Sequence, residues 1–289
     1  MRRLIAALCV AALAILTACS RDRPPNPLFD AAGYHVRDGK VYFLKAFPGR
    51  AFEVDGADAG TFRSFDATYA RDKASVYIDG IQLPDADPSS FTPLDRPGFA
   101  KDRLHVYLLG LPISDDPDHF VLLEGNLSKD SRVVYWSDGH VLSDDPTGFI
   151  IISNTDHYLF TRDGRTVHVN GNPIPGAVPH TFRVLQGAYA RDDQRVYYFA
   201  NQIAGADATS FRPRQGPYAG DSGRVYWMGN PIAGANPATF QVLNADFECS
   251  ADDRRAYYRD TVITAADPRA FPPGRAVTGC TDTSISFAQ

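Results

Sequence analysis

The sequence has few of the features that identify enzymes, metalloproteins or nucleic-acid-binding proteins. Its seven histidines form no H-x-H or H-E-x-x-H pattern, so they indicate no metal site, and no cofactor is expected. No G-x-S-x-G, phosphate-binding or dinucleotide-binding motif is present, so we expect no catalytic residue and no enzymatic activity. The formal net charge is −5, which argues against a nucleic-acid partner.

Long hydrophobic runs are also scarce, and the one at the N-terminus predicts export. Two arginines precede the almost wholly apolar segment Leu4 to Ala18, which is short for a membrane span but typical of a secretory signal. The stretch Leu16-Thr17-Ala18-Cys19 resembles the lipobox of bacterial lipoproteins. That resemblance implies a signal peptide over residues 1–18 and a lipid such as palmitate on Cys19. An ordinary signal peptide cleaved elsewhere is the alternative.

The residues after Cys19 predict where the mature chain lies. Ser20 favours the outer membrane, because proteobacterial lipoproteins retained at the inner membrane carry an aspartate at this position. Residues 19–32 include RDRPPNP, which is typical of a solvated tether. Removing residues 1–18 also removes two arginines, which lowers the formal charge from −5 to −7. We therefore expect an acidic, soluble body in the cell envelope, attached to the membrane by its lipid.

Cysteines are few as well, four in the whole chain. Cys9 leaves with the signal peptide and Cys19 carries the lipid, so Cys249 and Cys280 remain as an even pair in an oxidising compartment. We expect a disulfide between them, which contributes about 3.5 kcal/mol by the chain-entropy estimate. A redox site is the alternative, but the C-x-x-C spacing typical of such sites is absent.

Glycine, proline and aromatic residues are plentiful by contrast. The chain has 23 glycines, 21 prolines and 12% aromatic residues. This composition favours many short strands separated by turns over long helices. The expected fold class is all-β.

Residues 33–275 contain an internal repeat of roughly 30 residues. Well-formed copies read YARDKASVYIDGIQLPDADPSSF from Tyr69 and YARDDQRVYYFANQIAGADATSF from Tyr189. One aspartate anchors each of about eight copies, and successive anchors lie 28 to 34 residues apart. We number the copies repeat 1 to repeat 8 by these anchors: Asp38, Asp72, Asp102, Asp130, Asp163, Asp192, Asp221 and Asp252.

Other positions recur relative to the anchor, and each predicts a local structure. The aspartate opens a turn, and its recurrence argues against calcium binding or paired acid catalysis. A glycine eight residues later fits a second turn with positive φ. Asp-Pro or Asn-Pro pairs then predict a single helical turn. An aliphatic residue follows the anchor by eleven positions at Leu83, Ile113, Val141, Ile174, Ile203, Ile232 and Ile263, and a phenylalanine by eighteen or nineteen at Phe91, Phe120, Phe149, Phe182, Phe211, Phe240 and Phe271.

The repeat core resembles the DKNYY family, named for a repeated Asp-Lys-Asn-Tyr-Tyr-like motif. The core is degenerate here: Asp72-Lys73 with Val76-Tyr77, Asp192 with Val196-Tyr197-Tyr198, and Asp252 with Ala256-Tyr257-Tyr258, while His168 replaces the first tyrosine in repeat 5. The resemblance covers the chain from about Gly33 to Phe271. It implies an architecture and no activity.

The strand after the anchor is apolar on both faces in several copies, so neighbouring repeats must cover each other. Four-stranded propeller blades usually need about 40 residues. We therefore expect three-stranded repeats in an open array or superhelix, with a closed propeller-like ring as the alternative. The atypical first and last repeats predict caps, and residues 276–289 are expected to form a C-terminal tail.

One row of aromatic residues suggests a binding role. The sixth position after the anchor holds Trp136, Tyr198, Trp227 and Tyr258, and such a row could stack on a glycan or an extended peptide. Packing between repeats is the alternative. The expected function is a non-enzymatic envelope lipoprotein that binds a protein or cell-wall partner. A polysaccharide-binding protein or hydrolase, with a carboxylate pair in the degenerate repeats, is the alternative function.

Overall fold

The computed structural model describes residues 23–289 and is all-β apart from one 3-10 turn. Cys19 and the expected signal peptide lie outside the described residues. None of the helical structure within 23–289 is long and apolar enough to cross a membrane. The chain divides into two compact parts, Met1–Val141 and Leu142–Gln289, which we call the N-terminal and the C-terminal part.

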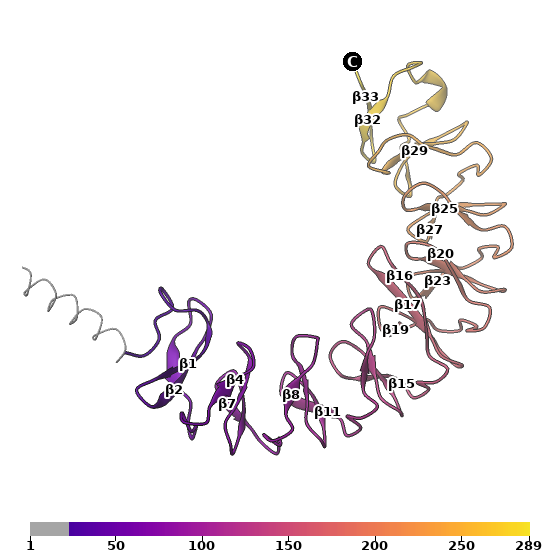
Figure 1. Cartoon of the computed structure of the whole chain (residues 1–289). Helices are drawn as coiled ribbons and strands as arrows, with labels where there is room; N and C mark the ends of the chain where they lie inside the picture. Colours follow the sequence, from indigo (N-terminus) through magenta and orange to yellow (C-terminus); the bar gives the residue numbers. More distant parts are fainter. Residues whose placement is uncertain (1–22) are drawn as a thin grey trace, which may run out of the picture. The chain divides into compact units, whose positions relative to one another are not determined.

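Small antiparallel sheets follow one another in tandem along the N-terminal part (Figure 1). The strands are β1 (Gly33–Arg37), β2 (Lys40–Leu44) and β3 (Ala51–Glu53); β4 (Arg63–Ser64), β5 (Tyr69–Arg71), β6 (Val76–Ile78) and β7 (Ile81–Leu83); β8 (Thr92–Pro93), β9 (Phe99–Lys101), β10 (Val106–Leu108) and β11 (Leu111–Ser114); β12 (Val121–Leu122), β13 (Ser128–Lys129), β14 (Val134–Tyr135) and β15 (Val141–Ser143). The division between the two parts falls within β15.

The C-terminal part continues the same meander and ends in a hairpin. Its elements are β16 (Ile150–Thr155), β17 (Tyr158–Arg162), β18 (Val167–Val169) and β19 (Asn172–Pro173); β20 (Arg183–Gln186), β21 (Tyr189–Arg191), β22 (Val196–Tyr198) and β23 (Asn201–Gln202); β24 (Arg212–Pro213), β25 (Tyr218–Gly220), β26 (Val225–Trp227) and β27 (Asn230–Pro231); β28 (Gln241–Val242), β29 (Cys249–Ala251), β30 (Ala256–Tyr258) and β31 (Thr261–Val262); η1 (Pro268–Ala270), β32 (Val277–Cys280) and β33 (Ile285–Phe287).

The expected number of strands per repeat was wrong. Seven of the sheets in residues 23–289 have four strands in sequence order, and none of these sheets closes on itself. Four strands fit into about 30 residues because most of them are only two or three residues long. The added strand is the first of each sheet, such as β4, which pairs with β5 through Arg63 opposite Arg71.

Each anchor aspartate from repeat 2 onward is buried and accepts several hydrogen bonds. In repeat 6, Asp192 Oδ1 accepts the backbone N–H groups of Gln194 and Arg195 at 2.8 and 2.7 Å, which forms the expected turn. Its Oδ2 accepts the Tyr197 hydroxyl at 2.8 Å and the Val178 N–H of repeat 5 at 3.0 Å. One carboxylate therefore closes its own turn, holds the next strand and binds the preceding repeat.

The link to the preceding repeat takes two forms. In most repeats a backbone N–H of the connecting turn donates directly, as Asp207 does to Asp221 at 3.1 Å. In repeats 4 and 5 a serine hydroxyl donates instead, as Ser114 does to Asp130 at 2.6 Å. The other backbone N–H donors are those of Asp58, Asp87 and Asn236, which donate to the carboxylates of Asp72, Asp102 and Asp252 respectively. In the second serine link the Ser143 hydroxyl donates to Asp163.

A hydrophobic layer fills the space between consecutive repeats. The Phe91 ring lies between Tyr69 of its own repeat and Tyr107 of the next, at centroid distances of 5.4 and 5.8 Å. Neighbouring repeats thus cover each other as the sequence predicts, and no repeat buries its apolar face alone. The full cluster is Tyr69, Val76, Leu83 and Phe91 from repeat 2 with Ala100 and Tyr107 from repeat 3.

Val141 is exposed, although the aliphatic residues at its place in most other repeats are buried. Its side chain is 55% exposed, whereas Ser143 two residues later is 5% exposed. The buried residue of this strand is Ser143, whose hydroxyl donates to the Asp163 carboxylate at 2.6 Å. Repeat 3 is similar, with Ser114 buried and Ile113 only half-buried.

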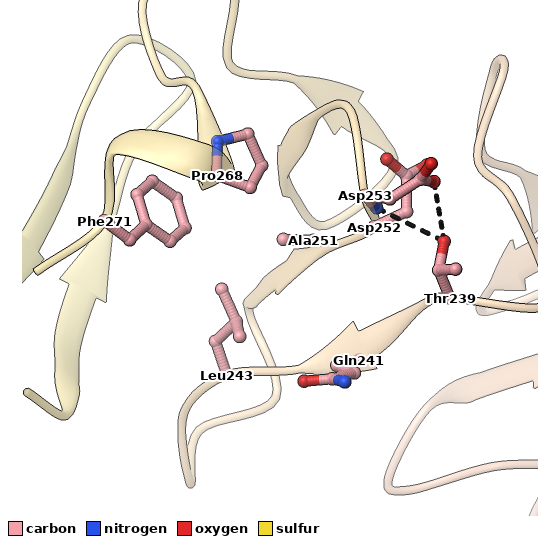
Figure 2. Close-up of a pocket in the computed structure, with 8 residues that line it drawn as sticks. All are labelled: Thr239, Gln241, Leu243, Ala251, Asp252, Asp253, Pro268 and Phe271. Carbon is pink, nitrogen blue, oxygen red and sulfur yellow. Dashed lines mark hydrogen bonds between the residues drawn. The ribbon is translucent and has the colours of Figure 1, made fainter. Parts of the chain in front are cut away.

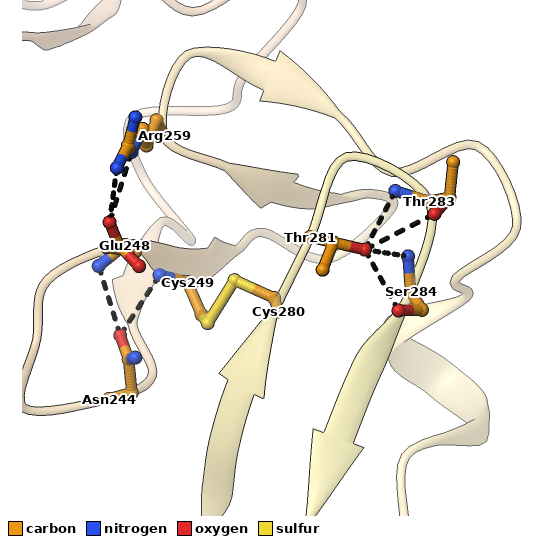
Figure 3. The surroundings of a disulfide bond; sticks show 8 residues. All are labelled: Asn244, Glu248, Cys249, Arg259, Cys280, Thr281, Thr283 and Ser284. Carbon is orange, nitrogen blue, oxygen red and sulfur yellow. Dashed lines mark hydrogen bonds and ion pairs between the residues drawn. A yellow bond between two sulfur atoms is a disulfide. The ribbon is translucent and has the colours of Figure 1, made fainter.

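Both ends of the array depart from the pattern. Asp38 is exposed with a φ of 49° in the β1–β2 hairpin turn, so it forms a turn without acting as a buried anchor. Residues 276–289, expected as a tail, contain the β32–β33 hairpin. There Thr281 takes the place of an anchor, because its Oγ1 accepts the N–H groups of Thr283 and Ser284 at 3.3 and 3.1 Å (Figure 3). The hairpin is therefore a truncated ninth repeat.

A disulfide joins the last full repeat to this hairpin. Cys249 in β29 and Cys280 in β32 are bonded, with a Cα–Cα distance of 5.8 Å (Figure 3). The expected pairing is therefore present. It crosslinks two successive repeats at the place where the array ends and the aspartate link is missing.

Burial and hydrogen bonding have opposite effects on the pKa of each buried anchor from Asp72 to Asp252, and hydrogen bonding has the larger effect. Burial would raise the pKa of Asp192, but the N–H groups of Gln194 and Val178 and the Tyr197 hydroxyl together hold this pKa below its ordinary value of 3.8. Burial and the bond to Asp192 raise the pKa of Tyr197 to about 12. At neutral pH the carboxylate is therefore charged and the phenol is neutral.

Replacing Asp192 by asparagine is predicted to lower the free energy of unfolding by about 3 kcal/mol, because an amide NH₂ would face donors that need a carboxylate. The matched control is Asp38→Asn, which changes an exposed turn residue and is expected to shift stability by less than about 0.5 kcal/mol. Urea unfolding monitored by far-UV circular dichroism measures both variants. Equal effects of the two substitutions would contradict the role of the buried anchor.

Acid is predicted to destabilise the body. The seven anchors from Asp72 to Asp252 all have lowered pKa values. The stability that such groups contribute is present above the unfolded pKa and is lost as pH falls through the folded pKa. The urea midpoint should therefore be constant between about pH 7 and 5 and fall steeply below about pH 4. A midpoint that stays unchanged down to pH 3 would refute the linkage.

Candidate functional site

The two-residue turn between the third and fourth strands has an unusual backbone in six repeats, repeats 2, 3 and 5 to 8. Its second residue is the predicted glycine with positive φ in four repeats. Its first residue also has positive φ, at 49° for Asp79 and 47° for Asn170. Aspartate and asparagine adopt this conformation readily, as in other two-residue hairpin turns. The four glycines are Gly80, Gly110, Gly171 and Gly229, with φ of 79°, 80°, 76° and 83°.

Four repeats place a large side chain at the first turn position. Leu109, Phe199, Met228 and Arg259 have φ of 50°, 54°, 47° and 56°, and this conformation costs such residues roughly 1 kcal/mol each. Leu109 is 66% exposed and Met228 is 40% exposed, so burial does not compensate fully for the strain. Strained residues that face solvent are candidates for a functional surface.

The predicted aromatic row lies directly beside these turns. Three of its residues each end the third strand of successive repeats in the C-terminal part: Tyr198 in β22, Trp227 in β26 and Tyr258 in β30. All three are half-buried. Trp136 is also half-buried, follows β14 and belongs to the N-terminal part. The structure therefore brings together three of the four predicted residues within one part.

Tyr198 contributes to packing between repeats. Its ring meets Tyr189 edge-to-face at a centroid distance of 4.8 Å. Gly229 of the next repeat lies against it so closely that a Cβ at residue 229 would be 2.7 Å from the Tyr198 Cβ. This contact gives the glycine a second role beside its positive φ. Inter-repeat packing, the alternative interpretation of the row, applies at least to Tyr198.

Trp227 and Tyr258 share one cation. The guanidinium carbon of Arg259 lies 5.6 Å from the Trp227 ring and 4.9 Å from the Tyr258 ring. Glu248 holds this guanidinium, accepting from Nε at 3.2 Å and from Nη2 at 2.5 Å (Figure 3). A fixed positive charge therefore lies among the aromatic side chains.

We call these strand-end and turn residues the turn face of the C-terminal part. It extends toward repeat 5, where Tyr158 meets Phe199 edge-to-face at 6.3 Å. The face offers aromatic rings for stacking, a flexible thioether and one guanidinium, which suit contact with an extended ligand. The turn face consists of Tyr198, Phe199, Trp227, Met228, Tyr258 and Arg259.

The other polar candidates take part in local interactions. Asp115 and Asp144 form ion pairs with Arg132 and Arg165. His168 is buried in the place of the anchor-bonded tyrosine, and burial lowers its pKa. Over residues 23–289, no group of three or more His, Cys, Asp or Glu side chains could hold a metal ion.

The sequence analysis missed the first turn position, although the sequence carries a signal for it. Asparagine, aspartate or glycine is normal before the second turn residue of such a hairpin. Leu109-Gly110 and Met228-Gly229 depart from that rule, and the departure marks these turns. Cys19, the predicted lipidation site, lies outside the described residues.

Comparison with known proteins gives one match. A family model described as the DKNYY family matches residues 34–91 and 69–201, which together make up more than half of the chain. The two ranges overlap, as expected for a repeat that can be aligned in several frames. No curated protein and no solved structure matches the chain.

Replacing Met228 by asparagine is predicted to raise the free energy of unfolding by about 1 kcal/mol, because asparagine adopts positive φ at a smaller cost. The converse control is Asn170→Met at the same turn position of repeat 5. It should lower stability by at least as much, since the Asn170 Oδ1 also accepts the Leu159 N–H at 2.7 Å. Chemical denaturation compares the two variants. A loss of stability in Met228→Asn would mean that this side chain serves the fold.

Proposed function

The chain belongs to the DKNYY family, and from this premise we propose that it is a non-enzymatic lipoprotein of the cell envelope whose turn face binds a protein or cell-wall partner. Family membership supports the tandem repeat. The proposed localisation and the proposed binding role rest on separate features of the chain.

The proposed localisation in the cell envelope rests on the lipobox-like stretch that ends at Cys19. A lipid on Cys19 attaches the body to the membrane, and Ser20 favours the outer membrane. The pairing of Cys249 with Cys280 suits the oxidising bacterial periplasm. Export also agrees with the apolar segment that precedes Cys19.

The observation that carries the binding role is the presence of strained, partly exposed apolar side chains on the turn face. Phe199 and Met228 hold positive φ at a position where asparagine would relieve strain. Neither side chain is needed to close the turn, because Asn170 closes the same turn in repeat 5. Phe199 also packs against a core cluster that includes Phe182 and Tyr197, whereas Met228 is 40% exposed, and a ligand that contacts Met228 supplies a reason for its presence.

The turn face fits an extended ligand better than a compact one. Trp227 and Tyr258 occupy the same position in two successive repeats, and Arg259 lies between their rings. A glycan strand or an extended peptide that crosses successive repeats meets one aromatic site in each. The proposed partner is therefore an envelope protein or a cell-wall polymer.

A polysaccharide hydrolase is the second candidate, since aromatic stacking also serves such enzymes. Glycoside hydrolysis needs a general acid and a second carboxylate on the other side of the scissile bond. The neighbouring acids of the degenerate repeats are engaged elsewhere, because Asp144 is paired with Arg165 and Asp116 accepts hydrogen bonds from Ser131. These interactions favour binding over hydrolysis.

The test is site-specific photo-crosslinking in intact cells that express the full-length chain. A photoreactive residue at position 228 should give a discrete adduct with one envelope component, and Phe199→Asn should reduce its yield while the fold is kept. Position 36 is the control, because Val36 is similarly exposed at 51% but lies in repeat 1. Co-sedimentation with purified cell walls detects a polymer partner. If position 228 gives no adduct above position 36 and the walls retain no protein, the proposal is wrong.

A further inference from the structure

Basic side chains fill an equivalent space in several repeats. The residue before the anchor donates to a backbone carbonyl of the connecting turn in the same repeat. Lys101 Nζ donates to the Pro117 carbonyl at 3.1 Å. Arg71 and Arg191 donate to the Pro88 and Ala208 carbonyls in the same way.

Repeat 7 fills this space from another position. Gly220 precedes the anchor, and Arg214 from the end of the first strand takes over, donating from Nη2 to the Pro237 carbonyl at 2.7 Å. A Cβ at residue 220 would lie 2.9 Å from the Arg214 Nε. The guanidinium carbon lies 5.9 Å from the Phe240 ring centroid. The space thus offers a cation a turn carbonyl and a phenylalanine ring.

In repeat 8 neither position carries a cation. Ala251 precedes the anchor of repeat 8. Leu243 is the counterpart of Arg214, because the two residues make equivalent backbone hydrogen bonds. The Leu243 N–H donates to the Cys249 carbonyl, and the Arg214 N–H donates to the Tyr218 carbonyl. A cavity of about 310 Å³ lies there, lined by Leu243, Ala251, Pro268 and Phe271 among others (Figure 2). Pro268 and Phe271 are the counterparts of Pro237 and Phe240, but repeat 8 supplies no basic side chain to lie between them.

The electrostatics of the cavity favour a cation. The Asp253 carboxylate reaches its lining, with Oδ1 accepting the Thr239 hydroxyl at 2.7 Å (Figure 2). Its Oδ2 lies 3.6 Å from Arg254 Nε. The Pro268 carbonyl accepts the Phe271 N–H at 3.2 Å and keeps a second lone pair. Gln241 lies opposite Ala251 on the neighbouring strand and adds an amide.

We propose that this cavity, the arginine slot, receives an arginine side chain of the partner. The guanidinium donates to the Pro268 carbonyl and the Asp253 carboxylate and lies against the Phe271 ring, as Arg214 lies against Phe240. The identity of the partner as an arginine-bearing protein rests on the proposed function. The slot itself rests on the comparison of repeats within the chain.

The slot is tested with N-acetyl-L-arginine methylamide added to the ¹⁵N-labelled mature chain. Saturable amide shifts are expected at Gln241, Ala251 and Phe271, and the uncharged citrulline counterpart should give none. Ala251→Arg should fill the slot from within, raise the melting temperature by roughly 3 °C and abolish the shifts. Arg191→Ala should open an equivalent slot in repeat 6 and create new shifts around Ala208.

Each failure has a distinct meaning. The slot is refuted if the wild-type chain gives no saturable shifts, or if Ala251→Arg retains them. If the probe binds but Ala251→Arg leaves the crosslink from position 228 at full yield, the partner does not use the slot. Phe199→Asn is expected to reduce the crosslink from position 228 and to leave the amide shifts caused by the arginine probe unchanged. That result would show that the turn face and the slot bind independently.

Discussion

A buried carboxylate that accepts hydrogen bonds from two repeats is the interaction on which the rest of the structure depends. Taking a charge out of water is costly unless its lone pairs are satisfied. Each buried anchor from Asp72 to Asp252 meets that condition with two N–H groups of its own turn and at least one further donor on its other oxygen, as Asp192 does. Because one donor comes from the preceding repeat, the charge is fully satisfied only when two repeats stack. Burial of the phenylalanine layer and satisfaction of the carboxylate are therefore coupled.

The ends of the chain show what happens where this coupling is absent. Repeat 1 is the first repeat among the described residues, and its aspartate, Asp38, lies in an exposed hairpin turn. The truncated ninth repeat has Thr281 in the anchor position, and the Cys249–Cys280 disulfide supplies a covalent link there. The hairpin also packs on repeat 8, since the Phe287 ring meets that of Phe271 at a centroid distance of 5.0 Å.

Much of the repeat could be predicted from the sequence because the relevant signals are local. The aspartate turn and the glycine turn each depend on residues close in the chain. The helical turn expected after each Asp-Pro or Asn-Pro pair is present as a 3-10 helix only at Pro268–Ala270, where Asp267 caps it, while the other described repeats have a hydrogen-bonded turn such as the one from the Asp87 carbonyl to the Phe91 N–H. The number of strands could not be predicted, because two-residue strands such as β4 leave too short a pattern. The serine links of repeats 4 and 5 could not be predicted, because Ser114 and Ser143 lie outside the recurring positions of the repeat. The tyrosine five residues after each anchor recurs almost as regularly as the aspartate, and this pairing was the missed signal for the hydrogen bond.

The candidate binding features lie where the repeat rules are relaxed. Packing accounts for most recurrent side chains, but it does not account for Met228 at positive φ or for the missing cation beside Ala251. The proposed binding residues are therefore those that depart from the repeat pattern.

The measurement that tests the central claim most directly is amide hydrogen exchange at Val178, Asp207 and Asn236. These three N–H groups lie in connecting turns outside every strand and donate to the anchor carboxylate of the next repeat. The account predicts that they are protected as strongly as the strand amides of Tyr197 and Tyr226. Exchange at the rate of exposed loop amides would show that the carboxylates do not hold neighbouring repeats together.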